Sequence, residues 1–224
     1  MKQRMLDGRG AESASLSAQA YATVRERIIL GLYAQGSRLP EQKLAEDLDV
    51  SRIPLREAIR QLEVDGFVQS LPRRGAVVWT WTPQAVHDLF DVRLGLEVAA
   101  TGLAAARVVA GRDATDIEAA LERSHEALRG IDTLRTAEAS AAFHEAIVLT
   151  TDNDLMVSLM RAVAGRMVWL FYLTSGRDPN VACAEHHELL DAIVSGNARL
   201  AEAVAWAHID RGRSPSLAAL PELS

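Results

Sequence analysis

The sequence predicts a mainly α-helical protein in two parts: a short helical segment ending in a β-hairpin, then an antiparallel bundle of six or seven helices. Three observations lead to this prediction. Apolar residues recur at helical spacing along most of the chain. The main strand pattern is a pair of short apolar runs around PRRG, and Thr82-Pro83 starts a new helical region after it. We therefore expect a flexible tail at 1–16, domains at 17–80 and 83–212, and a second tail at 213–224.

Composition excludes several classes of protein. Of the 224 residues 49% are hydrophobic, and the formal net charge is −6, which argues against intrinsic disorder and allows a buried core. The single cysteine, Cys183, excludes a disulfide scaffold and a cysteine-based zinc finger. We find no run of about eighteen apolar residues and no apolar signal segment at the start. We therefore expect a cytoplasmic protein with no membrane partner.

Charge is distributed unevenly between the two parts. Residues 1–80 carry twelve Lys or Arg against ten Asp or Glu, whereas residues 81–224 carry twelve against twenty. The acidic average therefore hides a mildly basic N-terminal part, which is compatible with DNA binding. Chance variation would explain the same difference, so the charge alone does not establish DNA as a partner.

The first domain is predicted from apolar spacing and from its turn residues. Pro40 is expected at the first position of a short helix, Ser51 at the N-cap of the next, and Gly66 at its end. The predicted elements are helices at 17–31, 42–50 and 51–66 and a hairpin within 67–81. Two helices joined by a tight turn and followed by a hairpin are typical of a winged helix-turn-helix.

The second helix of this motif carries a basic stripe. Arg52, Arg56 and Arg60 recur every four residues, so they share one face of the helix. The opposite face is apolar and contains Leu55, Ile59 and Leu62. Arginine at the N-terminus of such a helix can pair with guanine edges and phosphates. A solvated surface face is the simpler interpretation of an arginine stripe, but the neighbouring turn and hairpin favour DNA binding.

The segment from Val24 to Val78 closely resembles the winged-helix domain of GntR-family bacterial transcription regulators. Its VSRIPLREAIRQLEVDG core is specific, and the resemblance continues without a gap for about fifty-five residues. The resemblance implies that the recognition helix, the preceding helix and the wing tip contact DNA. The matching residues are Lys43, Ser51, Arg52, Ile53, Pro54, Arg56, Arg73, Arg74 and Gly75.

The second domain is predicted to be a helical bundle. Its helices are expected at about 83–110, 113–129, 133–150, 153–175, 180–195 and 197–211, with a break near Gly95 in the first giving a seventh. No strand pattern appears in this part. An antiparallel bundle packed mainly by Leu, Val and Ala follows.

Three histidines follow the apolar stripes of three different bundle helices: His144, His186 and His208. A single inward histidine is usually a hydrogen-bonded core residue. Three on facing helices are also how bundles build metal sites. The spacing alone leaves both interpretations open.

The part from Pro83 to Asp210 resembles the FCD ligand-binding domain found in FadR-type members of the GntR family. The segments AAFHEAIVLTTDNDLM and EHHELLDAIVSGN carry this resemblance. It implies a divalent metal held by His144, His186 and His208 beneath a small carboxylate effector. His187 lies outside the implied site and is a fallback ligand.

One metal ligand departs from the family pattern. Members with metal usually have Asp or Asn four residues before the first histidine, where this chain has Ser140. A neutral hydroxyl is a poor ligand for a divalent ion, so we expect weaker binding or a water in its place. Three neutral histidines can still hold zinc or nickel.

Arg93 matches the effector-binding arginine of the family's R-x-x-(L/I)-E motif, which Glu97 completes. A guanidinium facing a metal would suit a small carboxylate. A surface salt bridge between Arg93 and Glu97 is the alternative. The helix predicted at 153–175 offers Arg161, Arg166 and Tyr172 as further candidate pocket residues.

The sequence thus predicts a DNA-binding transcription regulator, expected to be a repressor, that binds a palindromic operator as a homodimer and responds to a small carboxylate. A metal-dependent hydrolase fused to a DNA-binding module is the alternative. Its general base would have to be Glu145 or Glu185, which adjoin histidines in the sequence and are expected to point away. A purely architectural DNA-binding protein is a third reading. Neither alternative explains both halves as well, so we do not expect an enzyme.

Overall fold

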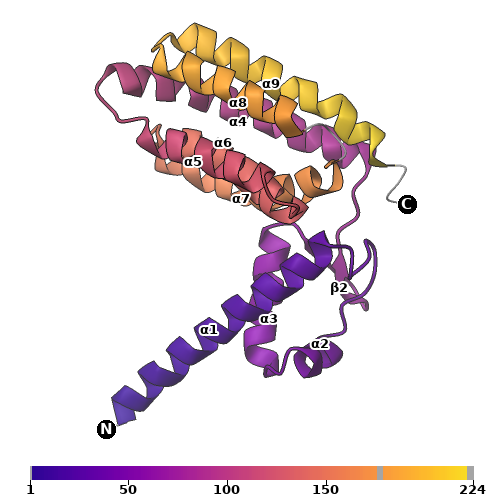
Figure 1. The fold of residues 1–224 in the computed structure, drawn as a ribbon. Helices are drawn as coiled ribbons and strands as arrows, with labels where there is room; N and C mark the ends of the chain where they lie inside the picture. Colours follow the sequence, from indigo (N-terminus) through magenta and orange to yellow (C-terminus); the bar gives the residue numbers. More distant parts are fainter. Residues whose placement is uncertain (1, 176–178, 221–224) are drawn as a thin grey trace. The chain divides into compact units, whose positions relative to one another are not determined.

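The computed structural model describes residues 2–175 and 179–220 and divides the chain into two compact units, Met1–Thr80 and Trp81–Ser224. Each unit has its own buried core. Figure 1 shows the course of the chain through both. The two units are described separately below.

The N-terminal unit has three helices and a two-stranded antiparallel sheet within the described residues. They are α1 (Lys2–Ile29), α2 (Glu41–Asp47), α3 (Arg52–Val64), β1 (Val68–Leu71) and β2 (Gly75–Val78). The strands pair Val68 with Val78 and Leu71 with Gly75. Helix α1 packs on α3, and α2 also packs on α3, around a core that includes Val24, Leu55 and Phe67. The predicted winged helix-turn-helix is confirmed.

Helix α1 begins at Lys2, so residues 2–16, which were predicted as a flexible tail, extend the helix expected at 17–31. Apolar periodicity reports which face of a helix is buried, and this segment has no such pattern. It also has no proline, and extending an existing helix adds one hydrogen bond for each residue fixed. Its two glycines, Gly8 and Gly10, cost only about 1 kcal/mol each.

Two predicted helix starts differ in detail. Pro40 is the N-cap of α2 rather than its first helical residue. Ser51 is the N-cap of α3 as predicted, but its side chain makes no capping hydrogen bond. Since both residues lie immediately before a helix, the positions of α2 and α3 are little changed.

The C-terminal unit contains six helices in the part of the chain that the structure describes. Figure 1 shows α4, α8 and α9 along one side and α5, α6 and α7 along the other. Their bounds are α4 Pro83–Val109, α5 Thr115–Leu128, α6 Thr133–Leu149, α7 Asp154–Leu173, α8 Pro179–Val194 and α9 Ala198–Ala218. Helix α4 is continuous through Gly95, so the smaller of the two predicted helix numbers is correct.

Side-chain caps begin several of these helices where the sequence indicated them. Thr82 accepts a hydrogen bond from the Ala85 amide at 3.1 Å, with Pro83 in the first turn. Asn153 accepts from the amides of Leu155 and Met156 at 3.2 Å each. These bonds satisfy amides that have no partner within the helix.

Helix α9 continues to Ala218, beyond the predicted end of the domain at 212. Arg213 explains the extension, because its Nη2 donates to Asp91 of α4 at 2.7 Å and its guanidinium lies over the Phe90 ring. Pro215 lies inside the helix, and Ser216 is buried. The predicted tail at 213–224 is therefore wrong for 213–218, while 221–224 lie outside the described residues.

Among the described helices, α7 alone is long and apolar enough to cross a membrane by length and composition. Its Met160, Met167 and Trp169 are buried in the unit's core, and the Trp169 ring meets Trp81 edge-on at 5.8 Å. These three apolar residues therefore contribute to packing within the bundle.

Candidate functional site

The exposed face of α3 carries the basic stripe that the sequence predicted. Arg52, Arg56 and Arg60 are all exposed, while the residues on the opposite face are buried: Leu55, Ile59 and Leu62. Arg56 Nε donates to Glu41 Oε2 of α2 at 2.7 Å. The first turn of α3 thus presents guanidinium groups on a helix that is fixed by its apolar side.

Four predicted DNA-binding residues before and within the first turn of α3 differ in exposure. Lys43, Ser51 and Ile53 are exposed, Ile53 to 68%. Pro54 is buried and packs with the core side of the helix. Its contribution to a DNA surface is therefore restricted to shaping the backbone. An exposed β-branched side chain next to arginines is suited to contact a thymine methyl group.

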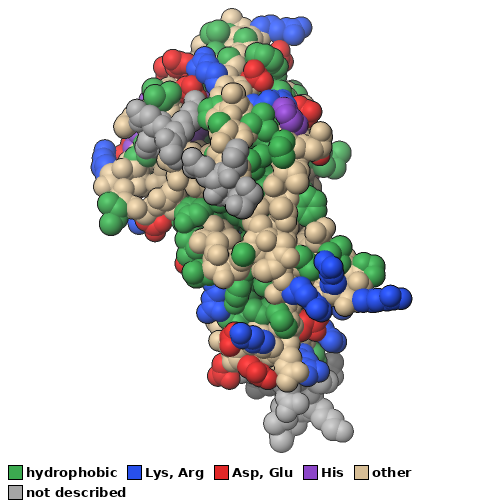
Figure 2. Space-filling view, turned by 90° about the vertical axis from the view of Figure 1, so that its right-hand side faces the viewer, with side chains coloured by type: hydrophobic (Ala, Val, Ile, Leu, Met, Phe, Trp, Pro, Cys, Tyr) green, Lys and Arg blue, Asp and Glu red, His purple; other side chains and the backbone are tan. Residues whose placement is uncertain are grey.

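The predicted wing residues are at the tip of the β1–β2 hairpin. Arg73, Arg74 and Gly75 are exposed, and Arg73 and Gly75 have positive φ of 63° and 71°. Arg38 Nε donates to the Arg74 carbonyl at 2.9 Å, which adds a third arginine that sequence reasoning missed. The SRLP turn before α2 was the available signal. Figure 2 shows Lys and Arg side chains projecting from the surface, interspersed with Asp and Glu.

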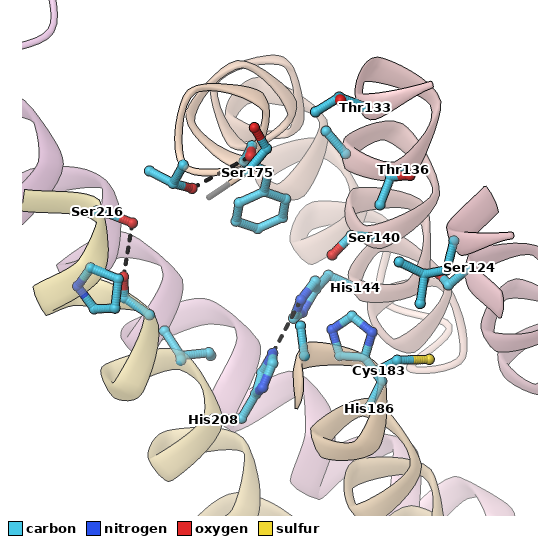
Figure 3. Close-up of a pocket in the computed structure, with 18 of the residues that line it drawn as sticks. Ser124, Thr133, Thr136, Ser140, His144, Ser175, Cys183, His186, His208 and Ser216 are labelled. Carbon is cyan, nitrogen blue, oxygen red and sulfur yellow. Dashed lines mark hydrogen bonds between the residues drawn. The ribbon is translucent and has the colours of Figure 1, made fainter. Parts of the chain in front are cut away.

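The three predicted histidines converge inside the C-terminal unit, although they come from three helices. His144 of α6, His186 of α8 and His208 of α9 are buried, and their nearest ring nitrogens all lie within 4.8 Å of one another. Figure 3 shows the three imidazoles facing one another, with Ser140 one turn before His144 on α6. The structure thus brings together the whole predicted ligand set.

Carboxylates orient two of the three imidazoles. Glu97 Oε2 lies 2.7 Å from His144 Nδ1, and Glu185 Oε2 lies 2.9 Å from His208 Nδ1. When Nδ1 donates its proton to a carboxylate, the Nε2 lone pair is available to a metal. Histidine ligands of metals usually make such a hydrogen bond through their second ring nitrogen. Glu185, which was expected to point away from the site, is not among the described residues that line the cavity. It contacts His208 from the Nδ1 side, and Arg211 of α9 also binds it.

The donor set fits a divalent cation. The two Nε2 atoms of His144 and His208 lie 3.4 Å apart. With both Nδ1 protons directed at carboxylates, two lone pairs face each other at this distance, and a shared cation would turn that repulsion into attraction. Zinc and nickel accept three imidazoles with a further position open. His144, His186 and His208 are therefore the residues that would hold the metal.

Arg93 and Glu97 form an ion pair, but it is buried, so the alternative of a surface salt bridge is wrong. Arg93 Nε donates to Glu97 Oε1 at 2.7 Å, and both residues are only 3% exposed. Burial favours the neutral acid, but Arg93 and His144 outweigh it and hold the pKa of Glu97 well below its usual range. Burial also lowers the pKa of His144 to about 4 against the opposing effect of Glu97. His144 is therefore neutral near pH 7, as metal binding requires.

A cavity of about 270 Å³ opens beside the three histidines. This volume is slightly below the usual range for ligand pockets, about 300–1,000 Å³. Arg93 and Ser140 line it, together with hydroxyl groups from α5, α6 and α9 and from the two residues that follow α7. These hydroxyl residues are Ser124, Thr133, Thr136, Thr174, Ser175 and Ser216.

Helix α7 contributes to this cavity with residues other than those predicted. Phe171 of its last turn and Thr174 and Ser175 just after its end line the cavity. The sequence candidates Arg161, Arg166 and Tyr172 are not among its described lining residues. Periodicity places residues on a helix face, but the rotation of α7 is set by packing that the sequence does not display. The last turn of the helix therefore faces the cavity, while its middle does not.

A winged helix with an exposed arginine stripe, joined to a helical unit with a histidine-lined cavity, defines the class of DNA-binding transcription regulators. Residues 16–78 match the model of the gntR family of bacterial regulatory proteins, and residues 88–211 match the FCD domain. The chain belongs to the gntR family and carries an FCD domain.

Relatives and solved structures agree with this assignment. The uncharacterized HTH-type transcriptional regulator YdhC of Bacillus subtilis is 26% identical, over 86% of this chain and 87% of its own. The Exu regulon transcriptional regulator of Escherichia coli is 25% identical, over 89% of this chain and 83% of its own. A putative GntR transcriptional regulator from Rhodococcus sp. RHA1 superimposes with a TM-score of 0.77 at 25% identity, covering 91% of this chain and 98% of its own.

These comparisons identify a DNA-binding transcriptional regulator. FCD domains often bind metal, and the three-histidine cluster is able to hold one. The relatives are regulators rather than enzymes, and nothing in the comparisons supports the hydrolase alternative. Glu185, one of the two bases considered for a hydrolase, is engaged by His208 and Arg211.

Proposed function

We propose that this protein is a cytoplasmic repressor that binds a palindromic operator as a homodimer, and that a small carboxylate effector changes its operator affinity. The observation that carries the proposal is the convergence of His144, His186 and His208 on a cavity that Arg93 also lines. A metal on the imidazoles and a guanidinium beside them provide two cationic groups for one small acid.

On the DNA side, the first turn of α3 reads base edges and the wing tip reaches the minor groove. Arg52 and Arg56 supply guanidinium groups, Ile53 an apolar contact, and Ser51 and Lys43 phosphate contacts. Arg56 is released from Glu41 when it moves to the DNA. Arg73 and Arg74 of the wing contribute charge, with Gly75 allowing the tight turn.

On the effector side, Arg93 Nη2 lies 3.4 Å from His144 Nε2, so the guanidinium is at the edge of the metal site. The hydroxyl groups around the cavity favour a carboxylate that carries hydroxyl groups of its own. One relative, from Bacillus licheniformis, is named as a gluconate operon transcriptional repressor and is 32% identical over 65% of this chain and 59% of its own. Gluconate is such a hydroxy acid.

A thermal-shift screen of small hydroxy carboxylates tests the effector. We expect at least one acid to raise the melting temperature of zinc-loaded protein, and to raise it less after chelation. The same acid should change operator affinity, since a coupling of about 1–3 kcal/mol is typical. If acids raised the melting temperature equally with and without chelator, the role of the metal in effector binding would be refuted.

Replacing Arg52 by alanine tests the recognition helix. We expect a loss of about 1–3 kcal/mol in binding to the cognate operator and a relaxed base preference, because a guanidinium contact to a base is lost. Fluorescence anisotropy with cognate and scrambled DNA measures both effects. Arg60→Ala, two turns further along the same exposed face, is the matched control and should have the smaller effect. Wild-type affinity for Arg52→Ala would contradict the assignment.

The Ser140→Asp variant tests the metal site, because Ser140 lies where a carboxylate would be one helical turn from His144. With zinc present, we expect a higher melting temperature than wild type and stronger resistance to chelator. Without a metal, the new carboxylate has no cation and its desolvation destabilises the fold. A lower melting temperature both with and without zinc would show that the histidines are core residues only.

A further inference from the structure

A second group of ligating side chains lies between α5 and α8. His125 of α5 and Cys183 and His187 of α8 have potential ligand atoms within 4.8 Å of one another. Cys183 is buried, His125 is half-buried and His187 is exposed. We call these three residues the thiol–imidazole cluster.

Helical spacing builds this cluster from two packed helices. Cys183 and His187 are four residues apart and therefore on one face of α8. His125 faces them from α5, and its ring stacks on that of His187 with centroids 4.5 Å apart and an angle of 26°. Glu122, three residues before His125, places its Oε2 3.6 Å from His125 Nδ1. Two short-spaced pairs on facing helices are a common way to assemble a metal site.

The orientation of His187 suits a ligand. Its Nδ1 lies 3.0 Å from the Cys183 carbonyl oxygen, which only accepts, so Nδ1 carries the proton and donates. The Nε2 lone pair is then available to a cation, as in histidine ligands whose second nitrogen binds a carbonyl.

The cluster is distinct from the three-histidine site. His186 and His187 are adjacent on α8 but belong to the two different groups. In Figure 3 the sulfur of Cys183 points away from His208. The sequence suggested His187 as a fallback ligand for the three-histidine site. In the structure His187 instead lies beside His125 of α5, in the thiol–imidazole cluster.

We propose that the thiol–imidazole cluster is a second divalent-metal site, which takes a zinc-class cation through Cys183, His125 and His187. Thiolate and imidazole donors favour such borderline cations over magnesium or calcium. Three protein ligands leave the fourth tetrahedral position to water or to Glu122. The Glu122 carboxylate adds negative charge beside the cluster, which favours a cation there.

The position of the cluster gives a bound cation a structural effect. It would join α5 to α8, and both helices line the effector cavity through Ser124 and Cys183. A cation that binds only the folded protein stabilises it by mass action. A cation at the cluster would therefore stabilise the packing of α5 against α8 at the edge of the cavity, whether or not an effector is bound.

Cobalt titration of the chelator-stripped full-length protein tests this proposal, because the chain has a single cysteine. We expect a thiolate-to-cobalt charge-transfer band in the near ultraviolet, which the three-histidine site cannot produce. The intensity of the band should stop rising once one cobalt ion per chain occupies the cluster. Excess zinc should displace that cobalt and abolish the band.

Two variants separate the cluster from other cobalt sites. Cys183→Ser should lose the band while keeping the weaker visible bands of cobalt on imidazole. The His125→Gln/His187→Gln double variant, which alters residues outside the buried core, should lose it as well, and circular dichroism checks that it folds. A wild-type protein without the band, or a double variant that keeps it unchanged, overturns the proposal.

Discussion

Replacing Glu97 by alanine is expected to lower the free energy of unfolding by about 3–5 kcal/mol. Glu97 accepts a hydrogen bond from Arg93 Nε and lies 2.7 Å from His144 Nδ1, with all three residues buried. Its loss leaves the Arg93 guanidinium in the core without a counter-ion and frees the His144 ring. Urea denaturation of full-length protein, followed by tryptophan fluorescence, measures the change.

Two controls separate the buried charge from general effects. Arg199→Ala removes an exposed pair with Glu202 and should change stability by no more than about 1 kcal/mol. An Arg93→Met/Glu97→Leu double variant removes both charges together and should recover much of the loss. A Glu97→Ala variant as stable as Arg199→Ala would refute the structural role assigned to this ion pair.

A chain ending at Thr80 is expected to bind the operator about 100-fold or more weakly than the full protein. One winged helix contacts one half-site, and linking two of them raises affinity by about 10²–10⁴ through effective concentration. We expect the shortened chain to be monomeric and the full chain dimeric by light scattering. Anisotropy with operator DNA measures the affinities.

A fusion of residues 1–80 to an unrelated dimeric coiled coil is the matched control, and it should recover part of the lost affinity. The result that contradicts the dimer proposal is a mass of one 24.3 kDa chain for the full-length protein. Equal operator affinities for the full and shortened chains would contradict it too.

Much of the fold could be predicted because its signals are local. The apolar stripe of α3, the PRRG hairpin, and the caps Thr82 and Asn153 each depend on residues within a few positions of one another. The same is true of the helix faces that carry His144, His186 and His208. Their convergence followed from the family resemblance, since spacing alone left a core role open.

The remaining features depend on contacts between segments distant in sequence. Glu185 was expected to point away from the site, but it reaches α9 because α8 and α9 pack together. The extension of α9 past 212 depends on Arg213 meeting Asp91. The cluster of His125 and His187 was missed for the same reason, since these residues belong to different helices and are 62 positions apart in the sequence. Contacts of this kind produce no periodic pattern in the sequence from which they could be predicted.

The continuity of α4 through Gly95 has a mechanical consequence. Pro83, where the chain enters the helix, and Glu97, which contacts His144, belong to one unbroken helix and are separated by about 21 Å along its axis. An α-helix without a kink transmits displacement along its length as a stiff rod. A displacement of the segment around Glu97 is therefore carried to Pro83, and a break at Gly95, which lies between them, would have absorbed that motion.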